Sequence, residues 1–114
     1  MSKLPIEFCR HILDEINFVL KATSNLNYDQ FILDEVLKRA VVRSLEIIGE
    51  AVKQIAPETK DLKPQIEWKP MAGLRDKLIH GYFGVDYAIV WDIVKSKLPT
   101  LKIQIADLIT ILSK

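Results

Sequence analysis

Five residues in one short stretch of the chain have side chains suited to chemistry: Arg75, Asp76, Lys77, His80 and Tyr82. An arginine presents a permanent cation with five fixed donors to a phosphate, and a histidine can move a proton near neutral pH. Asp76 and His80 are four residues apart, so in a helix they share a face, where the carboxylate could orient the imidazole. The stretch therefore predicts phosphodiester chemistry that needs no metal.

The same residues also have plain structural interpretations. A lone histidine at the end of a helix often interacts with the last carbonyls, and Arg75 could pair with Asp76 or Glu67 as a surface ion pair. Tyr82 would by default be an aromatic residue at the end of the bundle. Because Arg75 and His80 lie about 140° apart around a regular helix, they meet at one substrate only if the helix end unwinds or a cleft encloses it.

A second set of charged residues follows a helical line further upstream: Arg39, Arg43, Glu46 and Glu50. These four step by four, three and four residues and so share one side of a helix. Such a stripe is either the solvated face of the helix or a polar seam between two copies of the chain, where opposite charges on antiparallel helices pair. Gly49 lies beside this stripe and favours a close helix crossing.

The elements that must position these side chains are helices throughout. Apolar residues recur at helical spacing, and Gly and Pro fall between the periodic segments, which predicts an all-α fold. We expect one antiparallel bundle of four to five helices that occupies residues 1–114. The predicted helices span 6–23, then from Asn27 or Asp29 to Ala56, then 70–80 and 86–97, with a fifth from Pro99; residues 57–70 form a connection that holds Trp68 against the bundle.

Two of these helices carry well-defined apolar stripes. The first helix is expected to bury Cys9, Ile12, Leu13, Ile16, Val19 and Leu20. The second is expected to bury Leu33, Val36, Leu37, Ala40, Ser44, Ile47, Ile48, Ala51 and Ile55. If the second helix is continuous from Gln30 to Ala56, it is about 40 Å long at 1.5 Å per residue, and part of it would pack on a second copy of the chain.

Length and composition exclude several classes of protein. The 114 residues suit one domain, and 49% hydrophobic with 27% charged residues is an ordinary globular balance. A formal charge of +1 provides no overall basic field for nucleic acid, so a polyanion would need a local site. The single Cys9 can form neither an internal disulfide nor a zinc site. No apolar run approaches a membrane span and no signal peptide is apparent, which predicts a cytoplasmic protein.

Several motifs together resemble the HepT-like branch of the HEPN superfamily. They are the run from Arg43 to Ala51, Ile66-Glu67-Trp68, Met71-Ala72-Gly73-Leu74-Arg75-Asp76, His80-Gly81-Tyr82, Val85-Asp86 and Val90-Trp91. The most specific part is an arginine followed after four residues by histidine and after one more by tyrosine, just downstream of Trp-x-x-Met-x-Gly. The resemblance covers nearly the whole chain.

The resemblance implies a dimeric helical bundle that acts as a metal-independent ribonuclease without a cofactor. Arg75 would hold the scissile phosphate, His80 would act as general base or acid, and Asp76 would assist. Two subunits would pool Arg75, Lys77 and Lys69 around the RNA. HepT proteins are typically toxins paired with a nucleotidyltransferase antitoxin, MntA, which adenylylates the tyrosine that Tyr82 matches.

Two hypotheses follow from these residues. In the first, the chain is an RNA-cleaving toxin silenced by adenylylation of Tyr82. In the second, it is a non-catalytic helical module that binds a minimal nucleotidyltransferase, with Arg75 and His80 as interface or nucleotide-binding residues. The sequence does not identify the RNA, because recognition of shape and single strands leaves no short code.

Overall fold

The computed structural model describes residues 4–81 and 84–114, and within these ranges the chain is helical with one isolated β-bridge and no strand. The elements are α1 (Pro5–Ala22), α2 (Tyr28–Leu33), α3 (Glu35–Gln54), α4 (Pro57–Lys60), α5 (Trp68–Ala72), α6 (Leu74–Leu78), α7 (Tyr87–Asp92), a π-helical turn (Ile93–Lys97) and α8 (Leu98–Leu112). The predicted all-α fold is confirmed. No helix in the described ranges is both long and apolar enough to span a membrane.

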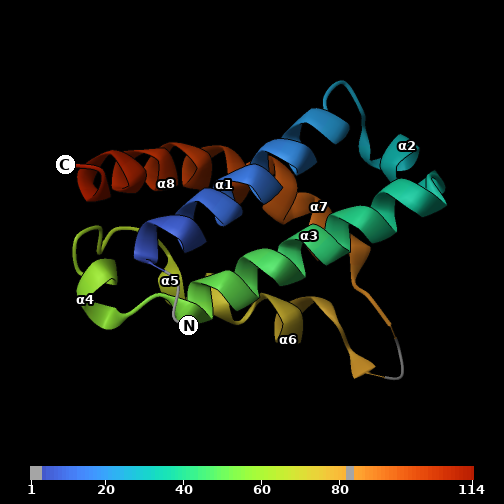
Figure 1. The fold of residues 1–114 in the computed structure, drawn as a ribbon. Coiled ribbons are helices and arrows are strands. Elements are labelled where there is room, and N and C mark those ends of the chain that lie inside the picture. The colour runs from blue at the N-terminus through green and yellow to red at the C-terminus, as the bar shows by residue number, and fades with distance from the viewer. Residues whose placement is uncertain (1–3, 82–83) are drawn as a thin grey trace.

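Helix α1 forms the middle of the bundle and packs on α3 on one side and α8 on the other (Figure 1). Pro5 occupies its first turn, where a missing N–H costs no hydrogen bond. Its buried residues follow helical spacing: Cys9, Ile12, Ile16 and Val19. The helix ends at Ala22, and the Thr23 hydroxyl donates to the Val19 carbonyl at 2.8 Å. The predicted first helix is confirmed, and of its predicted apolar stripe these four residues are buried, while Leu13 and Leu20 are half-buried against the core.

The predicted long second helix is wrong, because the chain breaks it at Asp34. Asn27 and Gln30 form a capping box at the start of α2, which has only six residues. Asp34 then adopts an extended backbone (φ −90°, ψ 94°), and its carboxylate accepts a hydrogen bond from the Leu37 N–H at 2.9 Å. This N-cap starts α3 as a separate helix, so the inference of a second copy from a 40 Å helix does not hold.

The break also changes which residues are buried. Leu33 and Val36, both predicted in the core, flank the break and are 81% and 82% exposed. The later part of the predicted stripe is confirmed, since Ser44, Ile48 and Ala51 are buried. The stripe omitted five buried residues of α3: Val41, Val42, Leu45, Gly49 and Val52.

The C-terminal part of the bundle is one almost continuous helical run. Asp86 caps α7 as predicted, with its carboxylate accepting from the Ile89 N–H at 3.2 Å. The run passes through the π-helical turn directly into α8, whose first turn contains Pro99. The predicted fourth and fifth helices are therefore present but joined. Helix α8 buries Leu98, Leu101, Ile105 and Leu108.

The connection between α3 and α5 is more ordered than predicted, because it contains the short helix α4. Trp68, at the start of α5, is half-buried and packs against the core. Its ring N–H donates to the carbonyl oxygens of Lys63 at 3.0 Å and Lys60 at 3.3 Å. The predicted role of Trp68 in fixing this connection to the bundle is confirmed.

The thiol of Cys9 lies in the centre of the bundle. Its side chain is fully buried, and burial raises the pKa of Cys9 to about 11 because a thiolate would lose its hydration.

Candidate active site

Helix α6 carries three of the predicted site residues on its exposed side and is held to the bundle by its apolar residues. Leu74 and Leu78 are buried in the core. Helices α5 and α6 approach α3 closely at Gly49, where an added Cβ would lie 3.1 Å from the Met71 carbonyl oxygen. A side chain at this position would therefore press against the α5 backbone, which would have to shift by a few tenths of an ångström. The exposed residues of α6 are Arg75, Asp76 and Lys77.

The predicted third helix is wrong in two respects. It is split at Gly73 into α5 and α6, and it does not reach His80, because the backbone leaves the helix after Leu78. The His80 N–H donates to the Gly84 carbonyl at 2.8 Å, and the Leu78 carbonyl accepts from the Asp86 N–H at 2.8 Å. Ile79 and Val85 form an antiparallel bridge. These bonds replace the helical ones, so the expected helical pairing of Asp76 with His80 is wrong.

A different carboxylate approaches His80. The His80 Nε2 lies 4.0 Å from the Asp86 Oδ2, with side chains 52% and 37% exposed. Sequence spacing missed this neighbour, because the two residues come together only through the turn. The available signal was the pair Gly81 and Gly84, which adopt positive φ values of 52° and 84° that other residues rarely adopt.

Arg75 also has a different partner from those predicted. Its Nε lies 4.0 Å from the Glu46 Oε2, whereas Glu67 pairs with Lys97 at 3.1 Å. The Arg75 side chain is 66% exposed and Glu46 is 20% exposed, so the cation remains accessible. Neither a hydrogen bond nor an ion pair joins Arg75 to His80 in the part of the chain that the structure describes.

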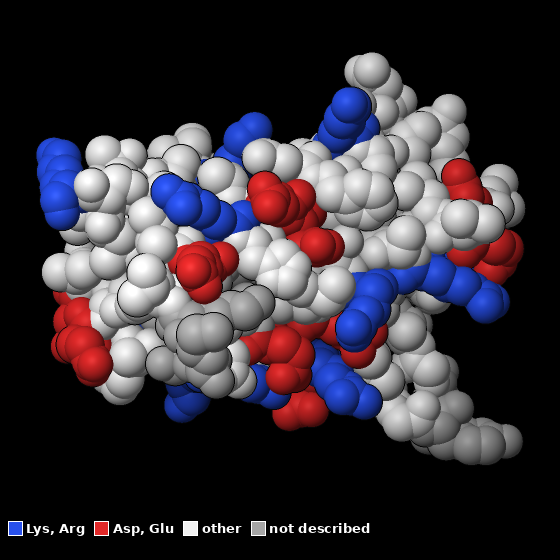
Figure 2. All heavy atoms as spheres, viewed as in Figure 1, with Lys and Arg blue, Asp and Glu red and all other residues white. Residues whose placement is uncertain are grey.

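The charged stripe on α3 is largely paired within its own helix. Arg39 contacts Glu35 at 3.4 Å, and Glu50 contacts Lys53 at 3.3 Å, while Arg43 is exposed. Only Glu46 reaches another helix. Figure 2 shows acidic and basic side chains intermixed over the visible face, in keeping with the small net charge. In the single chain, the stripe is thus a solvated face, and its role as a dimer seam stays a prediction.

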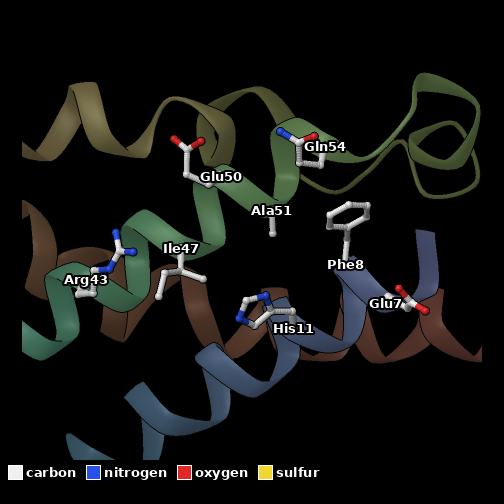
Figure 3. Close-up of a pocket in the computed structure, with 8 residues that line it drawn as sticks. All are labelled: Glu7, Phe8, His11, Arg43, Ile47, Glu50, Ala51 and Gln54. Carbon is white, nitrogen blue, oxygen red and sulfur yellow. The ribbon is translucent and has the colours of Figure 1, made fainter. Parts of the chain in front are cut away.

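A groove of about 240 Å³ lies between α1 and α3 (Figure 3), and neither Arg75 nor His80 lines it. Its walls combine apolar side chains with a polar rim. The lining residues are Glu7, Phe8, His11, Arg43, Ile47, Glu50, Ala51 and Gln54. Arg43 and Glu50 of the charged stripe therefore border this groove, which sequence analysis did not predict.

Tyr82 lies outside the described residues, so its predicted modification is not tested by the structure. Within residues 4–81 and 84–114, no three His, Cys, Asp or Glu side chains gather in a way that could hold a metal ion.

The all-α bundle and the Arg-x4-His spacing are among the features that the resemblance above implies for a HEPN protein. A model of the family described as "Ribonuclease HepT-like" matches residues 12–108. The chain therefore belongs to the HepT-like family of HEPN proteins.

Relatives with similar sequences carry ribonuclease names. The chain is 43% identical over 107 residues to a "Putative RNase" of Caldanaerobacter subterraneus, covering 94% of this chain and 96% of that protein. It is 44% identical over 102 residues to a "Putative RNase" of Methanocaldococcus jannaschii, covering 90% and 84%. It is 43% identical over 102 residues to the "Probable ribonuclease HepT" of Thermococcus cleftensis, covering 90% and 93%. No solved structure matches the chain.

Proposed function

We propose that the chain is a metal-independent endoribonuclease and the toxin of a type VII, HepT–MntA toxin–antitoxin pair. The observation that carries this proposal is the presentation of Arg75 and His80 as accessible side chains on a tightly anchored support, in a family of ribonucleases. The names of the three relatives support RNA as the substrate.

The proposed reaction is attack by an RNA 2′-hydroxyl on its own neighbouring phosphodiester. The 2′-oxygen bonds to phosphorus while the bond to the 5′-oxygen breaks, which leaves a 2′,3′-cyclic phosphate and a 5′-hydroxyl end. The His80 imidazole takes the proton of the 2′-hydroxyl, and the 5′-oxygen gains a proton from an imidazolium or water. Arg75 stabilises the negative charge of the phosphorane. Asp76, beside Arg75 on the exposed side of α6, assists at the phosphate.

We further propose that two subunits form one active cleft. In a single chain, Arg75 and His80 are more than half exposed, and the groove between α1 and α3 is not lined by them. A net charge of +1 gives a single chain little attraction for RNA. A homodimer that brings together two sets of Arg75, Lys77 and Lys69 would supply both enclosure and local positive charge. The α3 stripe would then form part of the seam.

Control by a nucleotidyltransferase is the part of the proposal that rests on the resemblance of Tyr82 to the tyrosine that MntA adenylylates. An MntA-like partner would transfer AMP from a nucleoside triphosphate to the Tyr82 hydroxyl, releasing pyrophosphate and a proton. This adds a bulky group with a negative phosphate two residues from His80. Sterics and charge repulsion would both keep RNA out of the site.

The test is cleavage of a mixed cellular RNA pool by purified protein in excess chelator. Wild type should cleave and leave 2′,3′-cyclic phosphate ends, and His80→Ala should reduce the rate at least about 100-fold, since a positioned proton-transfer group contributes that much. His11→Ala is the matched control, because His11 is the other histidine of the chain and is likewise about half exposed, beside Glu15 at 3.8 Å. Equal loss in both variants, or an inert wild type whose intact mass shows no adenylylation, would contradict the proposal.

A second test uses the living cell. Expression of the chain alone should arrest growth of the host, and His80→Ala should relieve the arrest. Co-expression of an MntA-like nucleotidyltransferase should relieve it as well and add the mass of AMP to the wild-type chain. The Tyr82→Phe variant should remain toxic in the presence of that partner, because it lacks the hydroxyl that accepts AMP.

The alternative function is a non-catalytic module that binds a minimal nucleotidyltransferase. The openness of the Arg75–His80 surface favours it, because exposed charged side chains also suit a protein interface. In that case wild type and His80→Ala would be equally harmless and equally inert toward RNA. Both Arg75→Ala and His80→Ala would instead weaken binding of the nucleotidyltransferase, as measured by calorimetry.

A further inference from the structure

Asp86 is the described acidic residue closest to the His80 imidazole, although it was expected only to cap a helix. We infer that Asp86 is a positioning residue for His80: its carboxylate fixes the orientation of the ring and keeps a proton on the nitrogen that faces it, which leaves the other nitrogen for RNA. The inference rests on the proposed ribonuclease function and gives a role to a residue outside the Arg-x4-His-x-Tyr element.

The backbone around the two residues is tied together on both sides of the turn. The Asp86 N–H donates to the Leu78 carbonyl at 2.8 Å, and the His80 N–H donates to the Gly84 carbonyl at 2.8 Å. Between these bonds, Ile79 and Val85 form the antiparallel bridge. The main chain of His80 is thus held opposite the main chain that leads into Asp86, so the backbone keeps the two residues adjacent.

The Asp86 carboxylate has one oxygen for each of two tasks. Its Oδ1 accepts from the Ile89 N–H at 3.2 Å and caps α7, while its Oδ2 lies 4.0 Å from the His80 Nε2. The cap holds the carboxylate in place, and an ionised carboxylate retains acceptor capacity on the second oxygen. A separation of 4.0 Å is longer than a hydrogen bond. Catalytic hydrogen bonds are often long before the substrate is bound and shorten in the complex.

This arrangement determines the chemistry of the ring. A neutral imidazole has one N–H donor and one acceptor nitrogen, and the group beside one nitrogen selects which carries the proton. An acceptor-only carboxylate beside Nε2 favours the form with the proton on Nε2. Nδ1 is then the free acceptor, which is the state that can take the proton of a 2′-hydroxyl.

Asp86→Asn separates the positioning role from the capping role. Asn caps helices as well as Asp does, so its side-chain oxygen can still accept from the Ile89 N–H. Its amide group, however, now donates where the carboxylate accepted, which disfavours a proton on Nε2. The matched control is Asp34→Asn, because Asp34 caps α3 through Leu37 and is not paired with a histidine in the described chain.

The first measurement is the tautomer of His80, read from the ¹⁵N shifts of its ring at pH 8.5. The chain has two histidines, so the His11→Ala variant assigns the signals. Wild type and Asp34→Asn should hold the proton on Nε2, and Asp86→Asn should move the population toward Nδ1. Identical tautomer populations in all three proteins would overturn the inference, whether or not the chain cleaves RNA.

The second measurement is cleavage of a fluorophore-labelled single-stranded RNA of mixed sequence. Asp86→Asn should lower kcat about 10- to 100-fold, a part of the proton-transfer contribution, and leave KM within about twofold. Asp34→Asn should cleave like wild type. Its thermal midpoint and that of Asp86→Asn should both lie within about 2 °C of wild type, because both caps are kept.

The outcomes separate this inference from the proposed function. If wild type is inert toward RNA, the ribonuclease proposal fails and the tautomer measurement alone decides the role of Asp86. If wild type is active and Asp86→Asn matches it in kcat, the positioning role is wrong. If Asp86→Asn loses stability as well, Asp86→Ser provides the second test, since it caps the helix without a charge and should show the same fall in kcat at an unchanged thermal midpoint.

Discussion

The three long helices of the bundle and the segment between Trp68 and Asp86 are built in different ways. In α1, α3 and α8, buried side chains repeat at helical spacing over 15 to 20 residues, and burial alone determines where each helix packs. The segment from Trp68 to Asp86 contains two five-residue helices and a bridged turn. Its shape depends on individual contacts, such as the carbonyl of Met71 against Gly49.

The difference shows where stability and chemistry reside in this fold. The bundle buries its apolar residues and leaves few functional groups exposed in a defined geometry. The segment that carries Arg75 and His80 inserts only a few anchors, Leu74 and Leu78 among them, and exposes almost every charged side chain. Substitutions in the two regions should therefore separate cleanly into effects on folding and effects on RNA cleavage.

The largest effect on folding is expected from Leu45→Ala in α3. Leu45 is fully buried, and removing a buried leucine side chain leaves a cavity that costs about 2 to 5 kcal/mol of unfolding free energy. Urea unfolding followed by circular dichroism measures this loss of unfolding free energy. The matched control is Leu33→Ala, which should change the unfolding free energy by less than about 0.5 kcal/mol because Leu33 is 81% exposed. Similar losses in both variants would contradict the assignment of the core.

An intermediate effect is expected from Asp34→Ala. Loss of the cap on the Leu37 N–H should cost about 1 kcal/mol of unfolding free energy, measured by the same urea titration. Asp34→Asn should retain most of the unfolding free energy that the cap contributes. This pair also tests the helix break, because alanine favours a continuous helix across residues 28–54. A stabilised Asp34→Ala variant would show that the uninterrupted helix is accessible and that the cap is not what starts α3.

The smallest effect on folding is expected from Arg75→Ala. The Arg75 side chain is 66% exposed, and its contact with Glu46 is long at 4.0 Å. Surface ion pairs of this kind contribute about 0 to 1 kcal/mol. The unfolding free energy should change by less than about 0.5 kcal/mol, while RNA cleavage should fall at least about 100-fold if Arg75 stabilises the phosphorane. Arg10→Ala, which removes an exposed arginine of α1 that has no part in the proposed site or seam, is the control for loss of one positive charge. An Arg75→Ala variant that cleaves normally would exclude Arg75 from the chemistry.

Apolar spacing and helix-start residues were sufficient to predict the helices whose position depends on neighbouring residues in the sequence. The stripe of Cys9, Ile12, Ile16 and Val19 predicted α1, and Asp86 and Pro99 predicted the starts of α7 and α8. The break at Asp34 was missed because apolar spacing continues across it. Aspartate is a common N-cap residue, but it does not by itself indicate a break where the apolar spacing of Leu33, Val36 and Leu37 continues across it.

The residues of the candidate site stay a prediction from the sequence, and their contacts were not predicted. The types and spacing of Arg75 and His80 identified them as functional candidates. Their carboxylate neighbours, Glu46 and Asp86, come from α3 and from beyond a turn, so helical spacing pointed to Asp76 instead. Such neighbours depend on tertiary packing, which the spacing of residues along the chain does not reveal.

The rate at which a reagent labels the buried thiol of Cys9 can report how often the bundle opens. Cys9 is the one cysteine of the chain, it has no exposed surface, and a pKa of about 11 leaves almost no thiolate at neutral pH. A thiol reagent can therefore reach it only when α1 separates from its neighbours, and the labelling rate reports the frequency of that opening. Comparing this labelling rate with and without RNA or a nucleotidyltransferase would show whether a bound partner makes the separation of α1 from its neighbours less frequent.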